Sequence, residues 1–199
     1  MSLPVGTVRA VICLACTGPA AAAMCPECAA SLRPAADRVL PRGVAVHSAF
    51  VHEGAARRLV HRLKYHPITG VAEFLAGAMA PRVTGSFDAI VPLPRAGLRR
   101  WSSGRDPAAD LTGALGAILG IEVVPALCAP LWWPRHAGSA RRARRAIAFR
   151  MAAPIPRRVL VVDDVFTTGA TARSAISALP TGRSVLVLTA TAAGRVSGG

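Results

Sequence analysis

Residues 159–171 read Val-Leu-Val-Val-Asp-Asp-Val-Phe-Thr-Thr-Gly-Ala-Thr: an apolar run, two carboxylates, and a turn of small hydroxylated residues around one glycine. The apolar run predicts a buried strand at residues 159–162, and a helix is expected over residues 171–179. In open α/β sheets, ligands bind where strands end and the following helices begin. The stretch therefore predicts a ligand site at the C-terminal edge of a sheet.

The turn is predicted to bind a phosphate, because backbone N–H groups, hydroxyls and a helix N-terminus would all point at one anion. Glycine at position 169 would let the backbone approach that anion closely. The two carboxylates repel phosphate, so their expected partners are neighbouring hydroxyl groups or a metal ion. Together these features predict a sugar phosphate, with its 5′-phosphate in the turn and its ribose 2′- and 3′-hydroxyls on the carboxylates. The ribose-binding candidates are Asp163 and Asp164, and the phosphate-binding candidates are Thr167, Thr168, Gly169, Ala170 and Thr171.

Two other interpretations of the turn can be compared with this one. A Walker loop is excluded here because the G-x-x-x-x-G-K-[ST] pattern is absent. A strand-to-helix turn whose hydroxyls cap the helix without any ligand is the remaining alternative. If the sugar-phosphate interpretation is right, magnesium is expected to arrive with the ligand's other phosphates, since it usually keeps substrate oxygens in its shell.

Four of the five cysteines form two C-x-x-C hooks, Cys13-Leu-Ala-Cys16 and Cys25-Pro-Glu-Cys28. This spacing is typical of a small zinc knuckle, and four protein ligands would leave no open position, so the zinc would be structural. The alternatives are two disulfides or a redox dithiol, and a cytosolic location argues against disulfides. The fifth cysteine, Cys128, lies alone in an apolar segment and is expected to be a buried small hydrophobic residue.

Composition limits the class of protein. The 199 residues are 52% hydrophobic, which is enough for one α/β domain with a small appendage. Lys+Arg is 24 against Asp+Glu 10, a net charge of +14. This balance favours phosphates, nucleotides or nucleic acid as partners and argues against a calcium-binding role.

No apolar stretch is long and unbroken enough to predict a membrane span. The apolar region near the N-terminus resembles a signal-peptide core, but Gly18-Pro19 interrupts it and cleavage would remove two of the paired cysteines. We therefore expect a cytoplasmic protein. Its oligomeric state is not assigned from the sequence.

Strand-like and helix-like segments alternate along the chain, which predicts a parallel sheet with helices on its faces. A zinc knuckle is expected at residues 1–33, a proline-containing linker at 32–43, and the larger domain at 44–199. Further strands are expected at residues 44–51, 87–93, 121–124 and 184–191, and further helices from residue 54, over 67–79 and over 107–119.

Residues 159–171 resemble the phosphoribosyl-pyrophosphate (PRPP) binding motif of type I phosphoribosyltransferases, and residues 13–191 as a whole resemble the ComF family. The paired cysteines, Leu63-Lys64-Tyr65 and Val91-Pro92-Leu93-Pro94 carry the wider resemblance. It implies a type I phosphoribosyltransferase fold, binding of PRPP with magnesium, and transfer of phosphoribose to an acceptor that the sequence does not identify. It also implies a role in handling single-stranded DNA during DNA uptake.

The sequence departs from the family pattern at three places. Ser103 stands where the family has arginine, Ile147 where it has asparagine, and Thr167 where some purine phosphoribosyltransferases have an acid that contacts the base. General-base help at the last position is therefore absent. No catalytic residue is assigned; the candidates beside the pyrophosphate are Leu93, Pro94 and Arg95.

Residues 135–150 contain six arginines and no acidic residue. One interpretation is contact with nucleic-acid phosphates, with Trp132 and Trp133 stacking on bases. The other is a solvated lid over the site, with the tryptophans buried beneath it. The candidates for either role are Arg141, Arg142, Arg144 and Arg145.

Overall fold

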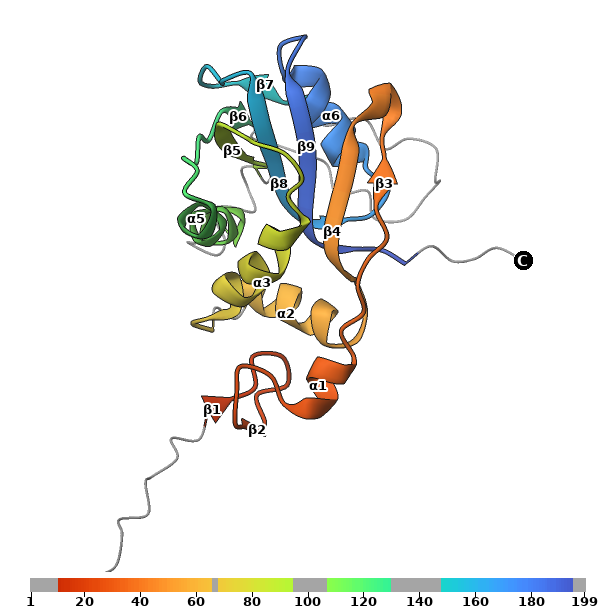
Figure 1. Ribbon diagram of the computed structural model, residues 1–199, viewed down its shortest axis with the longest axis vertical. Coiled ribbons are helices and arrows are strands. Elements are labelled where there is room, and N and C mark those ends of the chain that lie inside the picture. The colour runs from red at the N-terminus through yellow and green to blue at the C-terminus, as the bar shows by residue number, and fades with distance from the viewer. Residues whose placement is uncertain (1–10, 66–67, 95–106, 130–147, 195–199) are drawn as a thin grey trace, which may run out of the picture.

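The structure is a computed structural model that describes residues 11–65, 68–94, 107–129 and 148–194 (Figure 1). Within these ranges, five strands form a central sheet in the order β3-β4-β9-β8-β5. All are parallel except β3, which runs antiparallel to β4 at one edge. Their bounds are β3 (Arg38–Val39), β4 (Ala45–Val51), β5 (Ala89–Pro92), β8 (Arg158–Phe166) and β9 (Ser184–Ala192).

Helices cover both faces of this sheet. The buried side chains of α2 (Gly54–Tyr65), α3 (Val71–Met79) and α5 (Pro107–Leu119) form one cluster with one face of β8, and those of α6 (Ala170–Ala178) form a second cluster with the other face. Leu160 and Val162 belong to the first cluster, whereas Val159 and Val161 belong to the second, as the alternation of side chains in a strand requires. The predicted α/β class with a mostly parallel sheet is confirmed.

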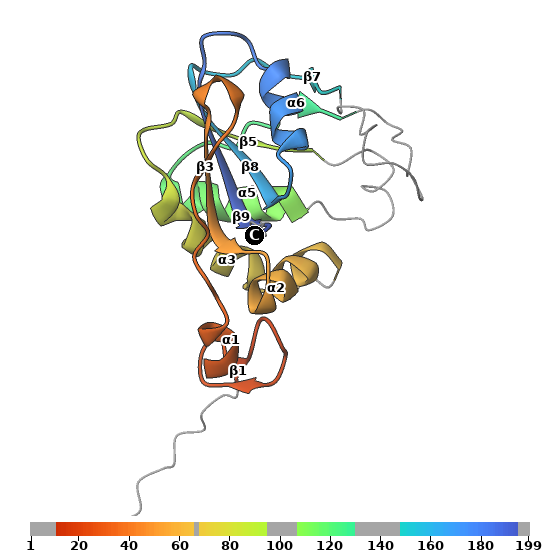
Figure 2. The ribbon, with the colours of Figure 1, turned by 90° about the vertical axis from the view of Figure 1, so that its right-hand side faces the viewer.

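The four cysteines lie in a module at the N-terminal end of the described chain. It consists of an antiparallel pair, β1 (Val11–Ile12) and β2 (Pro19–Ala20), followed by the short helix α1 (Pro26–Ala30). In Figures 1 and 2, α2 and α3 lie between this module and the sheet. The boundaries expected at residues 1–33 and 44–199 stay a prediction.

Several strand and helix boundaries differ from those predicted. β8 continues to Phe166 instead of ending at residue 162, because β9 pairs with it as far as Ala192. The helix expected over 67–79 begins at Val71, after Gly70 with φ 94°. Residues 121–124 do not form a regular strand; one parallel bridge, Ile90↔Val123, attaches them to β5.

The expectation that Cys128 is buried is wrong, since its side chain is exposed. Cys128 is the second residue of β6 (Leu127–Cys128), and among the described residues β6 pairs only with β7 (Arg150–Met151). Leu127 points into the second buried cluster, so the alternation of the strand turns its neighbour toward solvent. The remaining elements are the 3₁₀ turns η1 (Pro41–Gly43) and η2 (Ala80–Arg82). In the described part of the chain, no helix is long and apolar enough to cross a membrane.

Candidate functional site

β8 carries the two candidate carboxylates to the C-terminal edge of the sheet. The pairing of β8 with β5 ends at Val162, one residue before Asp163. Because neighbouring side chains in a strand point to opposite faces, Asp164 lies on the α2 face and Asp163 on the α6 face. A ligand that binds both carboxylates must therefore pass over the C-terminal end of β8, from one face of the sheet to the other.

Asp164 forms an ion pair with Lys64, the only lysine of the chain, and the distance from Nζ to Oδ1 is 2.8 Å. The two side chains are 9% and 21% exposed, respectively. A carboxylate this buried is costly without a partner of opposite charge. Lys64 comes from the last turn of α2, a hundred residues earlier. From the sequence, Lys64 belongs to a family motif and has no predicted role. The one signal for it is that it is the single lysine of the chain.

A ladder of buried hydroxyl groups crosses the sheet beside Asp164. The Thr191 hydroxyl donates to the backbone carbonyl of Asp164 over 3.3 Å, and it also contacts Nδ1 of His52 at 2.8 Å. With that hydroxyl as a donor to the carbonyl, the imidazole Nδ1–H donates to the hydroxyl. The ladder continues where the hydroxyls of Ser48 and Thr189 meet at 2.6 Å. These contacts fix the C-terminal ends of β4, β8 and β9 relative to one another.

His52 directly follows β4 and is half-buried. Burial lowers the pKa of His52, and the positive charges of Lys64 and Arg57 lower it further, whereas Asp164 acts in the opposite direction. The imidazole is therefore neutral at neutral pH. The role of His52 was not predicted, because no residue near it in the sequence indicates that it lies beside Lys64 and Asp164.

The predicted phosphate turn connects β8 to α6. Gly169 precedes the helix with φ 72°, a conformation that favours glycine, and a Cβ there would lie 2.7 Å from the Phe166 ring and 2.9 Å from Leu40. Local packing therefore requires glycine at this position, whatever the ligand. Thr168 is exposed, and its hydroxyl accepts a long hydrogen bond of 3.4 Å from the N–H of Ala170 in the first turn of α6.

Thr167 is exposed beside Thr168, and Thr171 lies half-buried in the first turn of α6. The guanidinium of Arg173 donates to the Thr168 carbonyl over 2.8 Å, which adds positive charge next to the turn. The first N–H groups of α6 carry the positive end of the helix dipole. Hydroxyls, N–H groups and a guanidinium, all of which can donate hydrogen bonds to an anion, thus lie in this turn or next to it.

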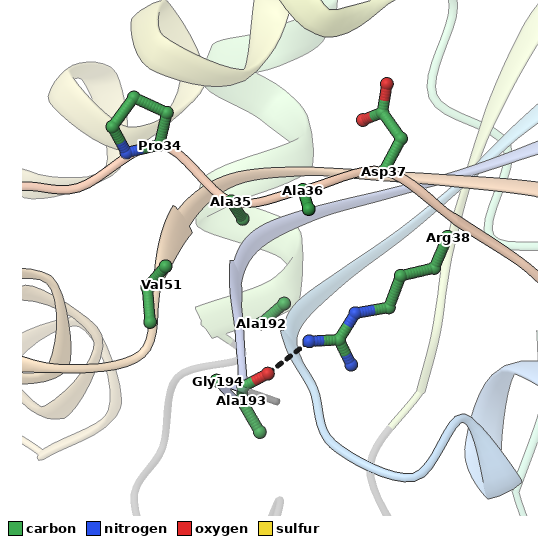
Figure 3. A pocket seen from close by; sticks show the side chains of 9 residues that line it. All are labelled: Pro34, Ala35, Ala36, Asp37, Arg38, Val51, Ala192, Ala193 and Gly194. Carbon is green, nitrogen blue, oxygen red and sulfur yellow. Dashed lines mark hydrogen bonds between the residues drawn. The ribbon is translucent and has the colours of Figure 1, made fainter. Parts of the chain in front are cut away.

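A second arginine, Arg38, lines a pocket of about 250 Å³ (Figure 3). Arg38 of β3 places its guanidinium over the Phe166 ring, 5.5 Å from the ring centroid, and donates to the Ala193 carbonyl. The Ala193 N–H in turn donates to the Phe166 carbonyl. Arg38 was not predicted as a site residue, because it lies in the predicted linker. The pocket is lined by Pro34, Ala35, Ala36, Asp37, Arg38, Val51, Ala192, Ala193 and Gly194.

The pyrophosphate-side candidates follow β5. The N–H of Leu93 donates to the Val162 carbonyl over 2.9 Å, which places the end of β5 next to Asp163. Leu93 is buried and Pro94 half-buried. Arg95 lies outside the described residues, as do the lid or nucleic-acid candidates Arg141, Arg142, Arg144 and Arg145.

The four-cysteine module brings its sulfur atoms together. The Sγ atoms of Cys13, Cys16, Cys25 and Cys28 all lie within 4.8 Å of one another, and those of Cys16 and Cys25 are 3.8 Å apart. Zinc–sulfur bonds of about 2.3 Å in a tetrahedron place the sulfurs about 3.8 Å apart. The donor set therefore fits one tetrahedral zinc ion.

The pKa values of two of these thiols shift in opposite directions. Burial acts to raise the pKa of Cys13, but hydrogen bonds from surrounding backbone N–H groups outweigh it and lower that pKa to about 6. The N–H of Cys28 acts to lower the pKa of Cys25, but the Glu27 carboxyl, burial and neighbouring thiols together raise it to about 12. The Cys13 thiol thus ionises readily, whereas the Cys25 thiol stays protonated to a higher pH, as expected when acidic groups share one site. A bound divalent cation would stabilise both thiolates.

Comparison with solved structures gives several distant neighbours, two of which are the following. No family model matches the chain, and no curated protein sequence matches it. UMP synthase of Leishmania donovani is 20% identical, with a TM-score of 0.35 over 81% of this chain and 27% of its own. Orotate phosphoribosyltransferase of Aeropyrum pernix is 18% identical, with a TM-score of 0.38 over 82% of this chain and 88% of its own. The chain thus spans about a quarter of the UMP synthase, and neither likeness assigns an activity.

Proposed function

We propose that the chain binds PRPP, or a nucleotide 5′-phosphate, together with magnesium, and transfers phosphoribose to a small acceptor, as a phosphoribosyltransferase-type protein of the ComF kind. The observation that supports this most is the continuity of β8, the turn and α6. One strand delivers Asp163 and Asp164 to the sheet edge, and the turn after it begins a helix through Gly169. The carboxylates that would accept from ribose hydroxyls thus lie a few residues from the N–H groups that would bind the phosphate.

The proposed ligand would span the edge of β8. Its 5′-phosphate would accept hydrogen bonds from the turn and the first N–H groups of α6, and its ribose hydroxyls would donate to Asp163 and Asp164. Lys64 would compensate the charge of Asp164 and fix its position through the 2.8 Å ion pair. Magnesium would be held by the ligand's phosphates and would neutralise their charge.

The proposed reaction replaces pyrophosphate on the anomeric carbon. The bond from that carbon to the pyrophosphate oxygen breaks, pyrophosphate leaves with the electron pair, and the acceptor's nucleophilic atom bonds to the carbon and releases its proton to water. The chain's own contribution would be to hold donor and acceptor in line and to keep the ribose oriented. Leu93 and Pro94, at the end of β5, would border the departing pyrophosphate.

The test of transfer is the release of pyrophosphate from magnesium and PRPP in the presence of a panel of bases and amines. We expect release by the wild type with at least one acceptor, and none by Asp163→Asn. Asp88→Asn is the matched control, because Asp88 pairs with Arg158 at the opposite, N-terminal end of β8. Pyrophosphate release that is equal in wild type and Asp163→Asn, or absent with every acceptor, would contradict the proposed transfer of phosphoribose.

We also propose that the four cysteines bind one structural zinc ion, which would cross-link the two hooks and would not take part in the reaction. A site of four reduced thiols fits a cytoplasmic protein. The test is the metal content of the purified protein: one zinc per chain is expected, and about none in the Cys25→Ser/Cys28→Ser double variant. Disulfides between the hooks would contradict the proposal.

The alternative function is a non-catalytic accessory that binds single-stranded DNA. The net charge of +14 and the six arginines of residues 135–150 favour it. Binding should weaken steeply with salt, with a slope set by the number of phosphates neutralised. Binding that is absent at low ionic strength, or that does not change with salt, would exclude this alternative.

A further inference from the structure

One arginine of α2 reaches the proposed metal site from outside the module. Nη2 of Arg58 donates a hydrogen bond of 3.3 Å to Sγ of Cys28. Four thiolates around a divalent ion carry a net charge of two negative units, so a guanidinium at this sulfur is electrostatically favoured. Groups that hydrogen-bond to metal ligands orient them and strengthen metal binding.

A second arginine, one helical turn further along α2, contacts the same module. Nε of Arg62 donates to the backbone carbonyl of Ala15 over 2.9 Å, and Ala15 is fully buried between the two cysteines of the first hook. At the start of α2, the Ser31 hydroxyl accepts from the N–H of Ala55 over 3.1 Å and donates to the Cys28 carbonyl over 2.9 Å. Three contacts along α2 therefore bind the helix to the cysteine hooks.

The same helix ends at the proposed ribose site. Lys64 lies two residues after Arg62, in the last turn of α2, and forms the ion pair with Asp164. Buried residues of the module and of α2, among them Cys13, Leu14 and Leu59, belong to one hydrophobic cluster. One rigid helix thus contacts both the proposed metal ligands and the carboxylate proposed to bind ribose.

We propose that Arg58 is an outer partner of the metal site and that α2, held by Arg58 and Arg62, couples metal loading to ligand binding through Lys64 and Asp164. The inference rests on the proposed function, namely zinc in the module and a sugar phosphate at Asp164. With zinc bound, the hooks hold the side of α2 that carries the two arginines, and Lys64 stays in place against Asp164. Without zinc, these hooks lose their cross-link, so the last turn of α2 loses its anchor.

The first test compares the zinc affinity of Arg58→Gln with that of the wild type, by competition with a chromophoric chelator. We expect the zinc affinity to fall by about 10- to 100-fold, the range found when outer partners of metal ligands are removed. Arg157→Gln is the matched control, since Arg157 is an exposed arginine next to the N-terminal end of β8. An unchanged affinity of Arg58→Gln would overturn the assignment of Arg58.

The second test measures hydrogen exchange of the last turn of α2 in zinc-loaded wild type, zinc-stripped wild type and zinc-loaded Arg58→Gln. Faster exchange at residues 61–65 is expected in the last two, with exchange in β8 and β9 unchanged. Exchange that is the same in all three would overturn the coupling. This measurement needs no nucleotide, so it tests the coupling even if the proposed function fails.

The third test measures the affinity for magnesium and PRPP by calorimetry. This affinity should fall severalfold in Arg58→Gln. In a protein that already carries Lys64→Gln, adding Arg58→Gln should cause no further fall. Equal affinities in wild type and Arg58→Gln would overturn the link to the ribose site. A wild type that loads zinc but binds no PRPP would instead refute the proposed function, and the hydrogen exchange would then decide the coupling alone.

Discussion

The four-cysteine module and the C-terminal edge of the sheet are assembled in different ways. The module takes all of its candidate ligands from residues 13–28, and two hooks place the sulfurs within 4.8 Å. The sheet edge takes Asp164 from β8, Lys64 from α2 and His52 from the end of β4, residues that only the fold brings together. A local site depends on its metal, whereas a site built across the sheet depends on the packing of the whole domain. Changes in each region should therefore have different consequences.

The largest expected effect is the loss of the metal. The Cys25→Ser/Cys28→Ser variant should lose the order of residues 13–30, because binding free energies on the order of 10 kcal/mol hold such zinc modules folded. The sheet should persist, so hydrogen exchange should rise in the module and in α2 but remain slow in β8 and β9. Cys128→Ser is the control, since Cys128 is exposed and far from the hooks in sequence. Loss of the whole fold in the double variant would contradict the expectation that the sheet folds without the metal.

The next effect comes from breaking the ion pair at the sheet edge. Lys64→Met removes the cation that pairs with the buried Asp164 carboxylate, and we expect a loss of about 3 kcal/mol in the free energy of unfolding. Replacing both residues, as Lys64→Met with Asp164→Asn, should restore part of this loss because no charge is left buried. Denaturant unfolding of the two single variants and the double variant measures the coupling. Additive losses would show that the pair does not interact.

Gly169→Ala should have a smaller effect on stability, about 2 kcal/mol, because φ is positive and the new Cβ would meet the Phe166 ring. Gly182→Ala is the matched control: φ is 75° there, but no atom lies within 4 Å of the added Cβ. Its cost should be about 1 kcal/mol, from the backbone conformation alone. Thermal unfolding of both variants separates the packing contribution from the backbone contribution. Equal losses would mean that the Phe166 contact can relax.

The smallest effect is a pH dependence from His52. Its pKa is lower in the folded protein than the ordinary value of 6.5, so the unfolded chain binds the proton more tightly. This contribution to stability is fully present above pH 6.5 and is lost as the pH falls below it. His52→Gln should therefore lose less stability than the wild type between pH 7 and pH 5, measured by denaturant unfolding. A larger loss of stability between pH 7 and pH 5 in the variant than in the wild type would contradict the lowered pKa of His52.

The parts of the molecule that were predictable from sequence are those encoded within short stretches. The apolar run before Asp163 predicted β8, and the two cysteine hooks predicted a cluster of four thiols. The Lys64–Asp164 pair was not predictable, because its partners lie a hundred residues apart and no pattern around Lys64 indicates which carboxylate it meets.

Two errors have the same physical origin. Cys128 looked buried because its neighbours along the chain are apolar, but the pairing of β6 with β7 turns it toward solvent. β8 was expected to end at residue 162, because polar residues follow there; its pairing with β9 continues past them. Strand pairing between distant segments decided both outcomes, and local composition does not encode it.

The most direct test of the proposed function is a calorimetric titration of magnesium and PRPP into the wild type and into Asp163→Asn/Asp164→Asn, with Asp88→Asn as the control. We predict that the wild type and Asp88→Asn bind and that the double variant does not. A folded wild type that does not bind PRPP, or a double variant that binds it equally well, would contradict the proposal that this sheet edge is a sugar-phosphate site.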